Sequence, residues 1–444
     1  MSLPAYPAYR ESGVPWLRRV PAGWGVRRLR FLADIRPSGV DKHSLEGELP
    51  VRLCNYVDVY KNDRITDALA FLEATATPAE IERFALRAGD VLITKDSETP
   101  DDIAAAALVE PSAAGVVCGY HLALLRPAPG AISGAFLFWA FKAPETLAQC
   151  SVRAQGITRF GLSTGAIGDV WLPLPPPAEQ RAIAAFLDRE CGKIDALVAE
   201  QERLIALLKE KRQAVISHAV TKGLDPSAPM KDSGVPWLGQ VPAHWEVHRL
   251  SRRCGFTSGK AHEPFIDEDG PFICVTARFV STQGAEQRRC TENLIPAGRG
   301  DILMVMSDLP KGRALAKAFL VRDNEAYAVN QRVCAVTPRA DDPAFLAYQL
   351  DRSPWLLAND DGVNQTHLSN QDFLKLPLLV PPRDEQELIA DFLDRATSAF
   401  DTLISESQRA IALLKERRAA LISAAVTGRI DVRGLVAAEE AQAA

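Results

Sequence analysis

Two internal repeats constrain the fold of this 444-residue chain more than any other feature. Residues 11–30 match residues 232–251 without gaps at 13 of 20 positions, with an offset of 221. Residues 179–221 match residues 385–427 at 25 of 43 positions, with an offset of 206. Ungapped matches of this length do not arise by chance, and the segments between them are far less alike. The chain is therefore a short arm, a divergent domain and a helical block, used twice.

Length and composition agree with a multidomain globular protein. At roughly 100–200 residues per domain, the length predicts two to four domains. No apolar run reaches the ~18 residues of a membrane span, and the first residues lack the apolar segment of a signal peptide. We therefore expect a cytoplasmic protein with no membrane partner. The predicted parts are an N-terminal arm (1–30), a first divergent domain (31–178), a first long helix (179–221), a linker arm (222–251), a second divergent domain (252–384), a second long helix (385–428) and a C-terminal tail (429–444).

Each helical block reads as one long helix with a narrow apolar stripe. Prolines stand just ahead of it, Glu179 and Glu385 place negative charge in its first turn, and Gly223 and Gly428 supply its end. Apolar residues at heptad spacing are typical of a coiled-coil seam. The seam residues predicted in the two copies are Ile183, Leu187, Ile194, Leu197, Leu204, Leu208 and Val215, and Ile389, Leu393, Phe400, Leu403, Leu414 and Leu421.

Two such stripes on one chain favour pairing of the helices with each other. An antiparallel pair would form a rod on the order of 60 Å long, at ~1.5 Å per residue. A polar residue occupies the vacant seam position in both copies, Gln201 and Ser407. It either fixes the register of the pair or marks a solvated kink.

The two divergent domains share short landmarks that indicate a common α/β fold. Gly89-Asp90 and Gly300-Asp301 each precede an apolar run, which predicts a turn into a buried strand. The polar loop GITRFGLS (156–163) stands where GVNQTHLS (362–369) stands in the second copy. The same scaffold with different loop chemistry is typical of related modules that recognise different targets. The predicted fold class is α/β, with two α/β domains joined by two long antiparallel coiled-coil helices in a pseudo-twofold internal repeat.

Charge argues against a simple basic nucleic-acid binder. The chain carries a formal charge of -5, with 12 Lys and Arg against 18 Asp and Glu in residues 31–178 and 16 against 17 in residues 252–384. If either domain binds nucleic acid, its positive charge must be confined to one face.

Motifs for enzyme chemistry are missing or defective. Residues 254–261, CGFTSGKA, resemble a phosphate-binding loop, but the glycine spacing is wrong and Ala261 replaces the Mg²⁺-binding Ser or Thr. His244 and His248 have the i, i+4 spacing of a zinc helix without the accompanying glutamate. Eight cysteines occur singly with no Cys-x-x-Cys pair, which favours reduced, packed thiols over a metal site. The sequence predicts no catalytic residue and no metal ligand.

Taken together, the motifs resemble the specificity subunits of type I restriction-modification systems. Both long helices begin with EQ-x-x-IA-x-FLD-R, from Glu179 to Arg189 and from Glu385 to Arg395. The SGVPWL arms, the TKDSET run and the CGYHLALLRP run are also similar to that family. The resemblance covers essentially the whole chain.

The resemblance implies a non-catalytic subunit with two target-recognition domains, each reading one half of a split, asymmetric site in double-stranded DNA. The helices would set the gap and dock two methyltransferase subunits, and two ATP-dependent motor-nuclease subunits would complete the assembly. S-adenosylmethionine, ATP and Mg²⁺ would then be bound by the partner subunits and no cofactor by this chain. The alternative is a coiled-coil scaffold that binds protein or RNA, which explains the helices and the acidic charge but not the family-like motifs.

Candidate contact residues follow from the loops that differ between the domains, because Arg, Lys, Asn and Gln pair with base edges and phosphates. Trp16 and Trp237 in the arms are candidate partner contacts, since exposed tryptophans are unusual on a monomer. The candidate DNA contacts are Lys42, Lys95, Ser97, Thr99, Tyr120, His121, Thr158 and Arg159 in the first domain, and Lys260, Arg278, Lys311, Arg313, Gln331, Arg332, Asn364, Gln365 and His367 in the second.

Overall fold

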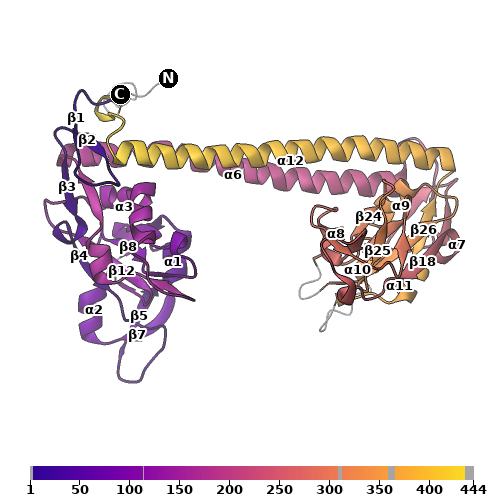
Figure 1. Cartoon of the computed structure of the whole chain (residues 1–444), viewed down its shortest axis with the longest axis horizontal. Helices are drawn as coiled ribbons and strands as arrows, with labels where there is room; N and C mark the ends of the chain where they lie inside the picture. The colour runs from indigo at the N-terminus through magenta and orange to yellow at the C-terminus, as the bar shows by residue number, and fades with distance from the viewer. Residues whose placement is uncertain (1–3, 114, 309–312, 359–365, 436–444) are drawn as a thin grey trace. The chain divides into compact units, whose positions relative to one another are not determined.

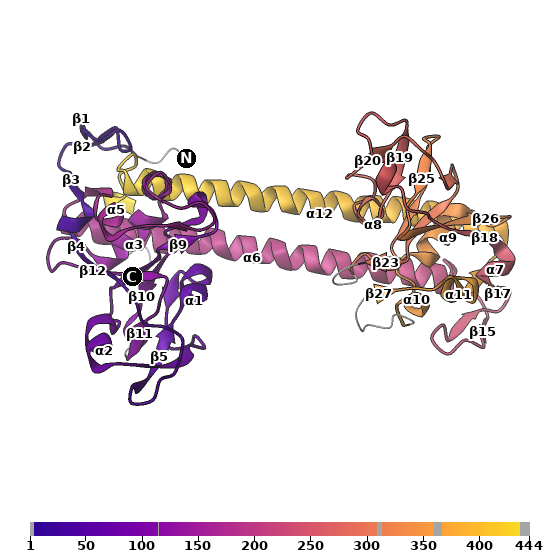
Figure 2. The ribbon, with the colours of Figure 1, turned by 60° about the horizontal axis from the view of Figure 1, so that its bottom comes forward.

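The computed structural model describes residues 4–113, 115–308, 313–358 and 366–435. They form two compact units: unit 1 comprises residues 1–202 and 408–444, and unit 2 comprises residues 203–407. Two long helices are present, as the sequence predicts, α6 (Pro177–Lys222) and α12 (Arg383–Val426) (Figures 1 and 2). Each long helix is divided between the units: α6 belongs to unit 1 up to residue 202 and to unit 2 from residue 203, and α12 belongs to unit 2 up to residue 407 and to unit 1 from residue 408.

Unit 1 is an α/β module with two larger sheets and three two-stranded pairs, β1-β2, β9-β13 and β3-β14. Its five-stranded sheet has the order β4-β12-β8-β10-β6, and its three-stranded sheet has the order β11-β5-β7. The strands are β1 (Tyr9–Glu11), β2 (Arg19–Pro21), β3 (Gly25–Arg28), β4 (Ala33–Pro37), β5 (Leu49–Cys54), β6 (Arg64–Ile65), β7 (Leu72–Ala76), β8 (Val91–Thr94), β9 (Asp96–Ser97), β10 (Ala106–Val109), β11 (Val116–Cys118), β12 (Leu122–Pro127), β13 (Phe160–Gly161) and β14 (Trp171–Leu174). The shorter helices are α1 (Tyr56–Lys61), α2 (Pro78–Phe84), α3 (Gly134–Lys142), α4 (Pro144–Ser151) and α5 (Thr164–Gly168).

Unit 2 repeats this plan with two four-stranded sheets, β18-β26-β22-β24 and β20-β19-β25-β21. The strands are β15 (Met230–Asp232), β16 (Gln240–Pro242), β17 (Glu246–Arg249), β18 (Cys254–Ser258), β19 (Phe272–Val275), β20 (Arg288–Cys290), β21 (Pro296–Ala297), β22 (Ile302–Val305), β23 (Ser307–Asp308), β24 (Ala318–Leu320), β25 (Tyr327–Val329), β26 (Val333–Pro338), β27 (Thr366–His367) and β28 (Pro377–Val380). The shorter helices are α7 (Leu250–Arg253), α8 (Ala277–Ser281), α9 (Pro343–Leu350), α10 (Pro354–Ala358) and α11 (Asn370–Leu374).

The Gly-Asp step begins a fully buried strand in each unit, as the sequence predicts. Gly89 and Gly300 have φ angles of 84° and 92°, in the left-handed region that favours glycine. The carboxylate of Asp90 then accepts a hydrogen bond from the Arg87 amide at 2.8 Å. The carboxylate of Asp301 accepts the equivalent bond from Gly298 at 2.8 Å. In each unit the aspartate therefore stabilises the turn before the strand, β8 or β22, by bonding to the amide three residues earlier.

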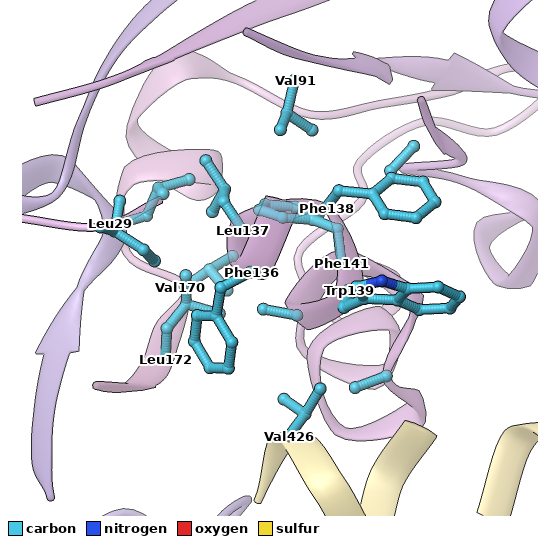
Figure 3. Close-up of a cluster of buried hydrophobic side chains, with 14 of the residues drawn as sticks. Leu29, Val91, Phe136, Leu137, Phe138, Trp139, Phe141, Val170, Leu172 and Val426 are labelled. Atoms are coloured by element: carbon cyan, nitrogen blue, oxygen red, sulfur yellow. The ribbon is translucent and has the colours of Figure 1, made fainter. Parts of the chain in front are cut away.

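An aromatic helix fills the core of unit 1 (Figure 3). In α3, six consecutive residues from Phe136 to Phe141 are buried, so the helix is covered on all sides. Figure 3 shows Leu29, Val170 and Leu172 beside it, and Val426 of α12 in the same cluster. Residues from the arm, the α/β module and both long helices thus share one hydrophobic core.

Each arm is fastened to the start of a long helix by a tryptophan. The indole of Trp24 is 2% exposed and donates to Glu179 Oε2 at 2.9 Å. The indole of Trp245 is fully buried and donates to Glu385 Oε1 at 3.1 Å. The acidic residue that opens each helix therefore satisfies a buried N–H group, in addition to facing the positive end of the helix dipole.

The glutamine that follows each of these acids is also structural. Gln180 is 2% exposed, accepts from the Ser133 amide at 2.8 Å and donates to the Pro175 carbonyl at 2.9 Å. Gln386 makes the same pair of bonds, to the Asp342 amide at 2.7 Å and the Pro381 carbonyl at 2.9 Å. In each copy the bond from the amide joins the start of the long helix to the N-cap residue of α3 or α9, and the other bond stays within the segment that leads into the long helix. Packing therefore explains why the Glu-Gln pair occurs in both copies.

Buried and half-buried positions on the long helices alternate at spacings of three and four. On α6 they are Leu187, Cys191, Ile194, Val198, Gln201, Ile205, Leu208, Arg212 and Val215, and on α12 they are Leu393, Thr397, Phe400, Ile404, Ser407, Ile411, Leu414, Arg418 and Leu421.

The second seam position is displaced by one residue from the sequence prediction. Leu197, Leu204 and Leu403 are exposed at 46%, 41% and 47%, so their assignment to the seam is wrong. The adjacent β-branched residues, such as Val198 and Ile404, are half-buried instead. Apolar residues occupy both neighbouring positions, so heptad spacing alone could not distinguish them. The other predicted seam residues are buried or half-buried: Ile183, Leu187, Ile194, Leu208, Val215, Ile389, Leu393, Phe400, Leu414 and Leu421.

Replacing Ile404 by Asn should destabilise unit 2 by about 1–3 kcal/mol, because an unpaired amide would enter the seam. Leu403→Asn, one residue away and exposed, should stay within about 0.5 kcal/mol of the wild type. Thermal unfolding of the two variants checks the seam. Equal losses of stability would show that the displaced seam is incorrect.

Candidate nucleic-acid interface

A hollow of about 810 Å³ lies in unit 2 at the N-terminal end of α8. Thr276 caps that helix by accepting from the Phe279 amide at 3.1 Å, which fixes the position of Arg278. We call this cavity the unit 2 hollow. Its lining residues are Glu263, Thr276, Ala277, Arg278, Ser281, Arg288, Asp308, Arg313, Ala314, Lys317, Asn330, Gln331 and Arg332.

The described lining of the unit 2 hollow is cationic, with five Arg or Lys residues against two carboxylates. Arg278 donates to Glu286 at 2.7 Å, and this pairing raises the pKa of the guanidinium. Within the described residues, Arg313 and Arg332 have no carboxylate at ion-pair distance. Their charge is therefore available to a bound anion.

A rigid loop presents Gln331 and Arg332 to the hollow. Asn330 is 6% exposed, and its Oδ1 accepts from the Gln331 amide at 2.8 Å and from the His262 amide at 3.3 Å. Gly259 lies so close that a Cβ atom there would be 2.1 Å from the Asn330 carbonyl oxygen. Only glycine permits this backbone approach.

Two buried polar side chains complete the support of that loop. His262 is fully buried and its Nε2 accepts from the Leu294 amide at 3.1 Å, so its Nδ1 donates to the Lys260 carbonyl at 2.7 Å. Burial acts to raise the pKa of Glu263, but hydrogen bonds from backbone amides and Asn330, with the nearby charge of Arg332, hold it below its ordinary value. Glu263 is therefore an ionised acceptor at the edge of a cationic cavity.

Unit 1 contains a smaller hollow of about 430 Å³ beside the paired strands β9 and β13. In this strand pair Ser97 lies opposite Phe160. The loop at 158–159, which leads into β13, therefore lies beside residues 96–98. The Asn55 capping box starts α1 and places Tyr56 at the hollow. We call this cavity the unit 1 hollow. Its lining residues are Tyr56, Asp96, Ser97, Glu98, Asp102, Thr158 and Arg159.

The unit 1 hollow has the opposite charge, with one cation against three carboxylates. Asp102 accepts from the Tyr60 hydroxyl at 2.8 Å, and the Tyr60 ring stacks on Tyr56 with centroids 5.5 Å apart. Burial and the Asp102 charge raise the pKa of Tyr56. The cavity thus combines aromatic faces with carboxylate acceptors.

Four of the predicted DNA contacts form one cluster next to the unit 1 hollow. His121 Nδ1 lies 2.6 Å from Asp96 Oδ2 and 3.4 Å from Arg159 Nη2. The His121 and Tyr120 rings are 4.0 Å apart, and Lys95 Nζ lies 4.9 Å from the centre of the Tyr120 ring. His121 adopts a φ of 71°, which is uncommon for a residue with a side chain and holds it in this cluster.

The two hollows occupy equivalent places in the duplicated fold. Each lies at the start of the helix that follows an inner strand of the second sheet, α1 after β5 of the β11-β5-β7 sheet and α8 after β19 of the β20-β19-β25-β21 sheet. Each is bordered by a two-residue strand pair, β9 with β13 or β23 with β27. The scaffold is common to both units and the lining side chains differ.

The structure brings together most, but not all, of the predicted contact residues. The unit 1 hollow is lined by three of them, Ser97, Thr158 and Arg159, and adjoined by three more, Lys95, Tyr120 and His121. The unit 2 hollow is lined by four of them, Arg278, Arg313, Gln331 and Arg332. Lys42, Thr99, Lys260 and His367 line neither hollow. Lys311, Asn364 and Gln365 lie outside the described residues.

Sequence reasoning missed the carboxylates and two of the cations. Asp96 and Glu98 alternate with Lys95, Ser97 and Thr99, which the sequence predicts as contacts, but the criterion of polar or cationic loop side chains does not select acids. Arg288 and Lys317 come from separate strands and loops, and no local pattern connects them to the site.

The predicted partner contacts in the arms have different exposure. Trp237 is 38% exposed and borders a recess of about 210 Å³ with Ile216 and Val220 of α6. Trp16, its equivalent in unit 1, is half-buried. The two histidines that resembled a zinc pair bond to carboxylates instead, His244 to Glu385 at 2.7 Å and His248 to Glu246 at 2.7 Å.

Comparison with known proteins gives consistent matches. The family model of the type I restriction modification DNA specificity domain matches residues 245–412. The putative type I restriction enzyme MjaX specificity subunit of Methanocaldococcus jannaschii is 21% identical over 434 residues, covering 93% of this chain and 95% of that protein. The MjaVIII specificity subunit of the same organism is 22% identical over 441 residues, covering 94% and 95%. The EcoBI specificity subunit of Escherichia coli is 37% identical over 84 residues, 19% of this chain and 18% of that protein.

Solved structures share the fold. A chain from a type I R-M system, solved to describe its complex assembly and conformational transition, superposes with a TM-score of 0.72 at 17% identity, covering 93% of this chain and 99% of that chain. The HsdS subunit from Thermoanaerobacter tengcongensis gives a TM-score of 0.50 at 18% identity, covering 93% and 98%.

The α/β fold is duplicated, with an equivalent hollow in each copy. Over nearly its whole length the chain is similar to specificity subunits of type I restriction-modification systems, and its residues 245–412 match the model of their DNA specificity domain. None of the described helices combines the length and the apolar character needed to cross a membrane.

Proposed function

We propose that this chain selects the DNA sequence on which a type I restriction-modification complex acts. Units 1 and 2 are its target-recognition domains, and each reads one half of a bipartite, asymmetric site in double-stranded DNA. The observation that carries the proposal is the pair of equivalent hollows with different linings. One scaffold with two sets of loop side chains suits two different half-sites.

The long helices set the number of base pairs between the half-sites by pairing as an antiparallel coiled coil. Two ion pairs support this pairing, Arg418 with Asp195 at 2.9 Å in unit 1 and Arg212 with Asp401 at 3.3 Å in unit 2. The two arginines, like the two aspartates, are related by the repeat offset of 206. The helices thus meet in the same register in each unit.

Polar residues at the middle of the seam favour register fixing over a kink. Ser407 is 6% exposed and Gln201 is half-buried. Both lie within uninterrupted helices. A polar group at a single seam position specifies register at some cost in stability.

Exposed leucines on the long helices supply surfaces for the methyltransferase subunits. Leu197 and Leu403 are 46% and 47% exposed, and Leu207 and Leu413 are 56% and 60% exposed. Each pair is related by the offset of 206, so the surface occurs twice. Two methyltransferase subunits, carrying S-adenosylmethionine, would dock there. Two motor-nuclease subunits with ATP and Mg²⁺ complete the complex, and this chain itself is non-catalytic.

Co-expression with the methyltransferase subunit, followed by methylome sequencing, tests the proposal. Adenine methylation should appear at one bipartite motif, and the two proteins should co-purify. Arg159→Ala should lower methylation at least about fivefold without loss of co-purification, because one good base contact contributes about 1–3 kcal/mol of discrimination. Arg87→Ala, an exposed residue outside the hollow, is the matched control. A complex that forms but methylates no bipartite motif would overturn the proposal.

A further inference from the structure

The two equivalent hollows carry opposite charge, although they occupy the same place in the fold. Among the lining residues that the structure describes, the unit 2 hollow has five cations and two carboxylates, and the unit 1 hollow has one cation and three carboxylates. DNA presents the same phosphate backbone at both half-sites. Cavities of opposite sign cannot both neutralise that backbone in the same way.

The free charge in unit 2 is suited to phosphate. Arg313 and Arg332 have no carboxylate at ion-pair distance among the described residues, and Lys317 donates only to the Ser281 carbonyl, at 3.3 Å. The loop that carries Arg332 is fixed by Asn330. The backbone that carries Arg332 is therefore already ordered before an anion binds, which lowers the entropy cost of binding.

The two cations at or beside the unit 1 hollow contact neighbouring side chains or backbone. Arg159 faces His121, whose ring contacts Asp96, and Lys95 lies over the Tyr120 ring and donates to the Ser38 carbonyl at 3.4 Å. The whole segment 31–178 also has 12 basic residues against 18 acidic residues, whereas residues 252–384 have 16 against 17. The imbalance of the unit 1 hollow thus extends to its whole domain.

We propose that the two half-sites are held by different forces, with unit 2 as the electrostatic anchor and unit 1 as a largely salt-insensitive reader. Unit 2 supplies most of the phosphate neutralisation through Arg313, Arg332 and their neighbours. Unit 1 selects bases through acceptors, Asp96 and Asp102, that suit the exocyclic amino groups of cytosine or adenine. This inference rests on the proposed function, because it assigns the roles of the two target-recognition domains.

Salt dependence separates the two roles. The measurement is the affinity of the complex with the methyltransferase for a duplex bearing its methylated motif, between 50 and 200 mM salt. The slope of log affinity against log salt becomes shallower by about 0.9 for each phosphate that the protein no longer neutralises. Arg313→Gln with Arg332→Gln should therefore lower the slope by up to about 1.8, whereas Lys95→Gln with Arg159→Gln should lower it by less than half as much. Arg339→Gln, an exposed unit 2 residue outside the hollow, is the control.

A second arm uses the wild-type protein, so it does not depend on how the variants fold. Duplexes with either half-site scrambled retain one specific half each. Binding to the duplex that keeps the unit 2 half should show the steeper salt dependence. Equal slopes for the two duplexes, or for the two double variants, would overturn the inference while leaving the proposed function intact. Failure of the proposed function is recognised separately, as a complex that methylates no bipartite motif.

A third arm tests the acceptors of unit 1. Asp102→Asn replaces one acceptor oxygen by a donor, so it should reduce discrimination at one base of the unit 1 half-site at least about fivefold and leave the unit 2 half-site unchanged. Asp67→Asn, exposed and outside the hollow, is the matched control. An unchanged preference at every base of the unit 1 half-site would contradict the assigned role of the carboxylates.

Discussion

Replacing Asp90 by Ala is expected to destabilise unit 1 by about 3–5 kcal/mol, because it leaves the buried Arg126 guanidinium without its counter-charge. The Asp90 side chain is 2% exposed and that of Arg126 is 13% exposed. Arg126 donates to both carboxylate oxygens, from Nε at 2.9 Å and from Nη2 at 2.7 Å. The same carboxylate closes the turn before β8 by accepting from Arg87. Calorimetry should show the unit 1 transition lowered by on the order of 10 °C.

The internal repeat supplies the control for this prediction. Asp301 is the equivalent residue in unit 2, but the position of Arg126 is taken there by Thr337, whose hydroxyl donates to Asp301 at 2.6 Å. Asp301→Ala removes hydrogen bonds from neutral donors and leaves no cation unpaired, so it should cost about 1–2 kcal/mol. Arg126→Thr should cost less than Asp90→Ala, because the introduced hydroxyl can donate to Asp90 as Thr337 donates to Asp301. Equal losses for Asp90→Ala and Asp301→Ala would show that the buried charge is unimportant.

The repeated parts of the fold were predictable because their packing is local in sequence. Heptad spacing identified both long helices, and the Gly-Asp step located two buried strands. The exact seam was not predictable, since leucines and β-branched residues stand side by side at 197–198 and 403–404. Contacts with the partner helix decide which of two adjacent apolar residues is buried.

The motif that most resembled a functional signature is explained by packing. Glu179 and Gln180 satisfy a buried indole and the start of α3, and their counterparts Glu385 and Gln386 do the same in unit 2. Recurrence in both copies cannot separate a side chain that supports the scaffold from one that contacts a partner protein, because both kinds would recur.

The candidate site was only partly predictable because its charges come together from distant segments. Arg278, Arg313 and Arg332 were recognisable as loop cations, but Arg288 and Lys317 reach the same hollow from other strands and loops. The acidic balance of both domains appeared to oppose DNA binding. Of the two hollows, the unit 2 hollow has the more cationic lining among the described residues, which is why the two half-sites should differ in salt dependence.

Inserting one heptad into each long helix, after Gln201 in α6 and after Ser407 in α12, is expected to lengthen the spacer of the recognised site by about three base pairs. Seven residues add about 10 Å of helix, and B-DNA rises ~3.4 Å per base pair. A complete heptad returns the seam to the same face, so the pairs Arg418–Asp195 and Arg212–Asp401 can still form. Both half-sequences should remain unchanged, because neither hollow is altered.

Methylome sequencing of cells that express the variant with its methyltransferase measures both properties at once. The control is the same heptad inserted into α6 alone, which shifts one helix past the other and separates Arg212 from Asp401. That variant should lose methylation by a large factor, since no single register then satisfies both ion pairs. An unchanged spacer in the doubly inserted variant would refute the role of the helices, and altered half-sequences would mean that the helices themselves contact the bases. If the spacer lengthens with the helix pair while both half-sites stay the same, then the half-site sequences and the spacer length are determined by different parts of the chain.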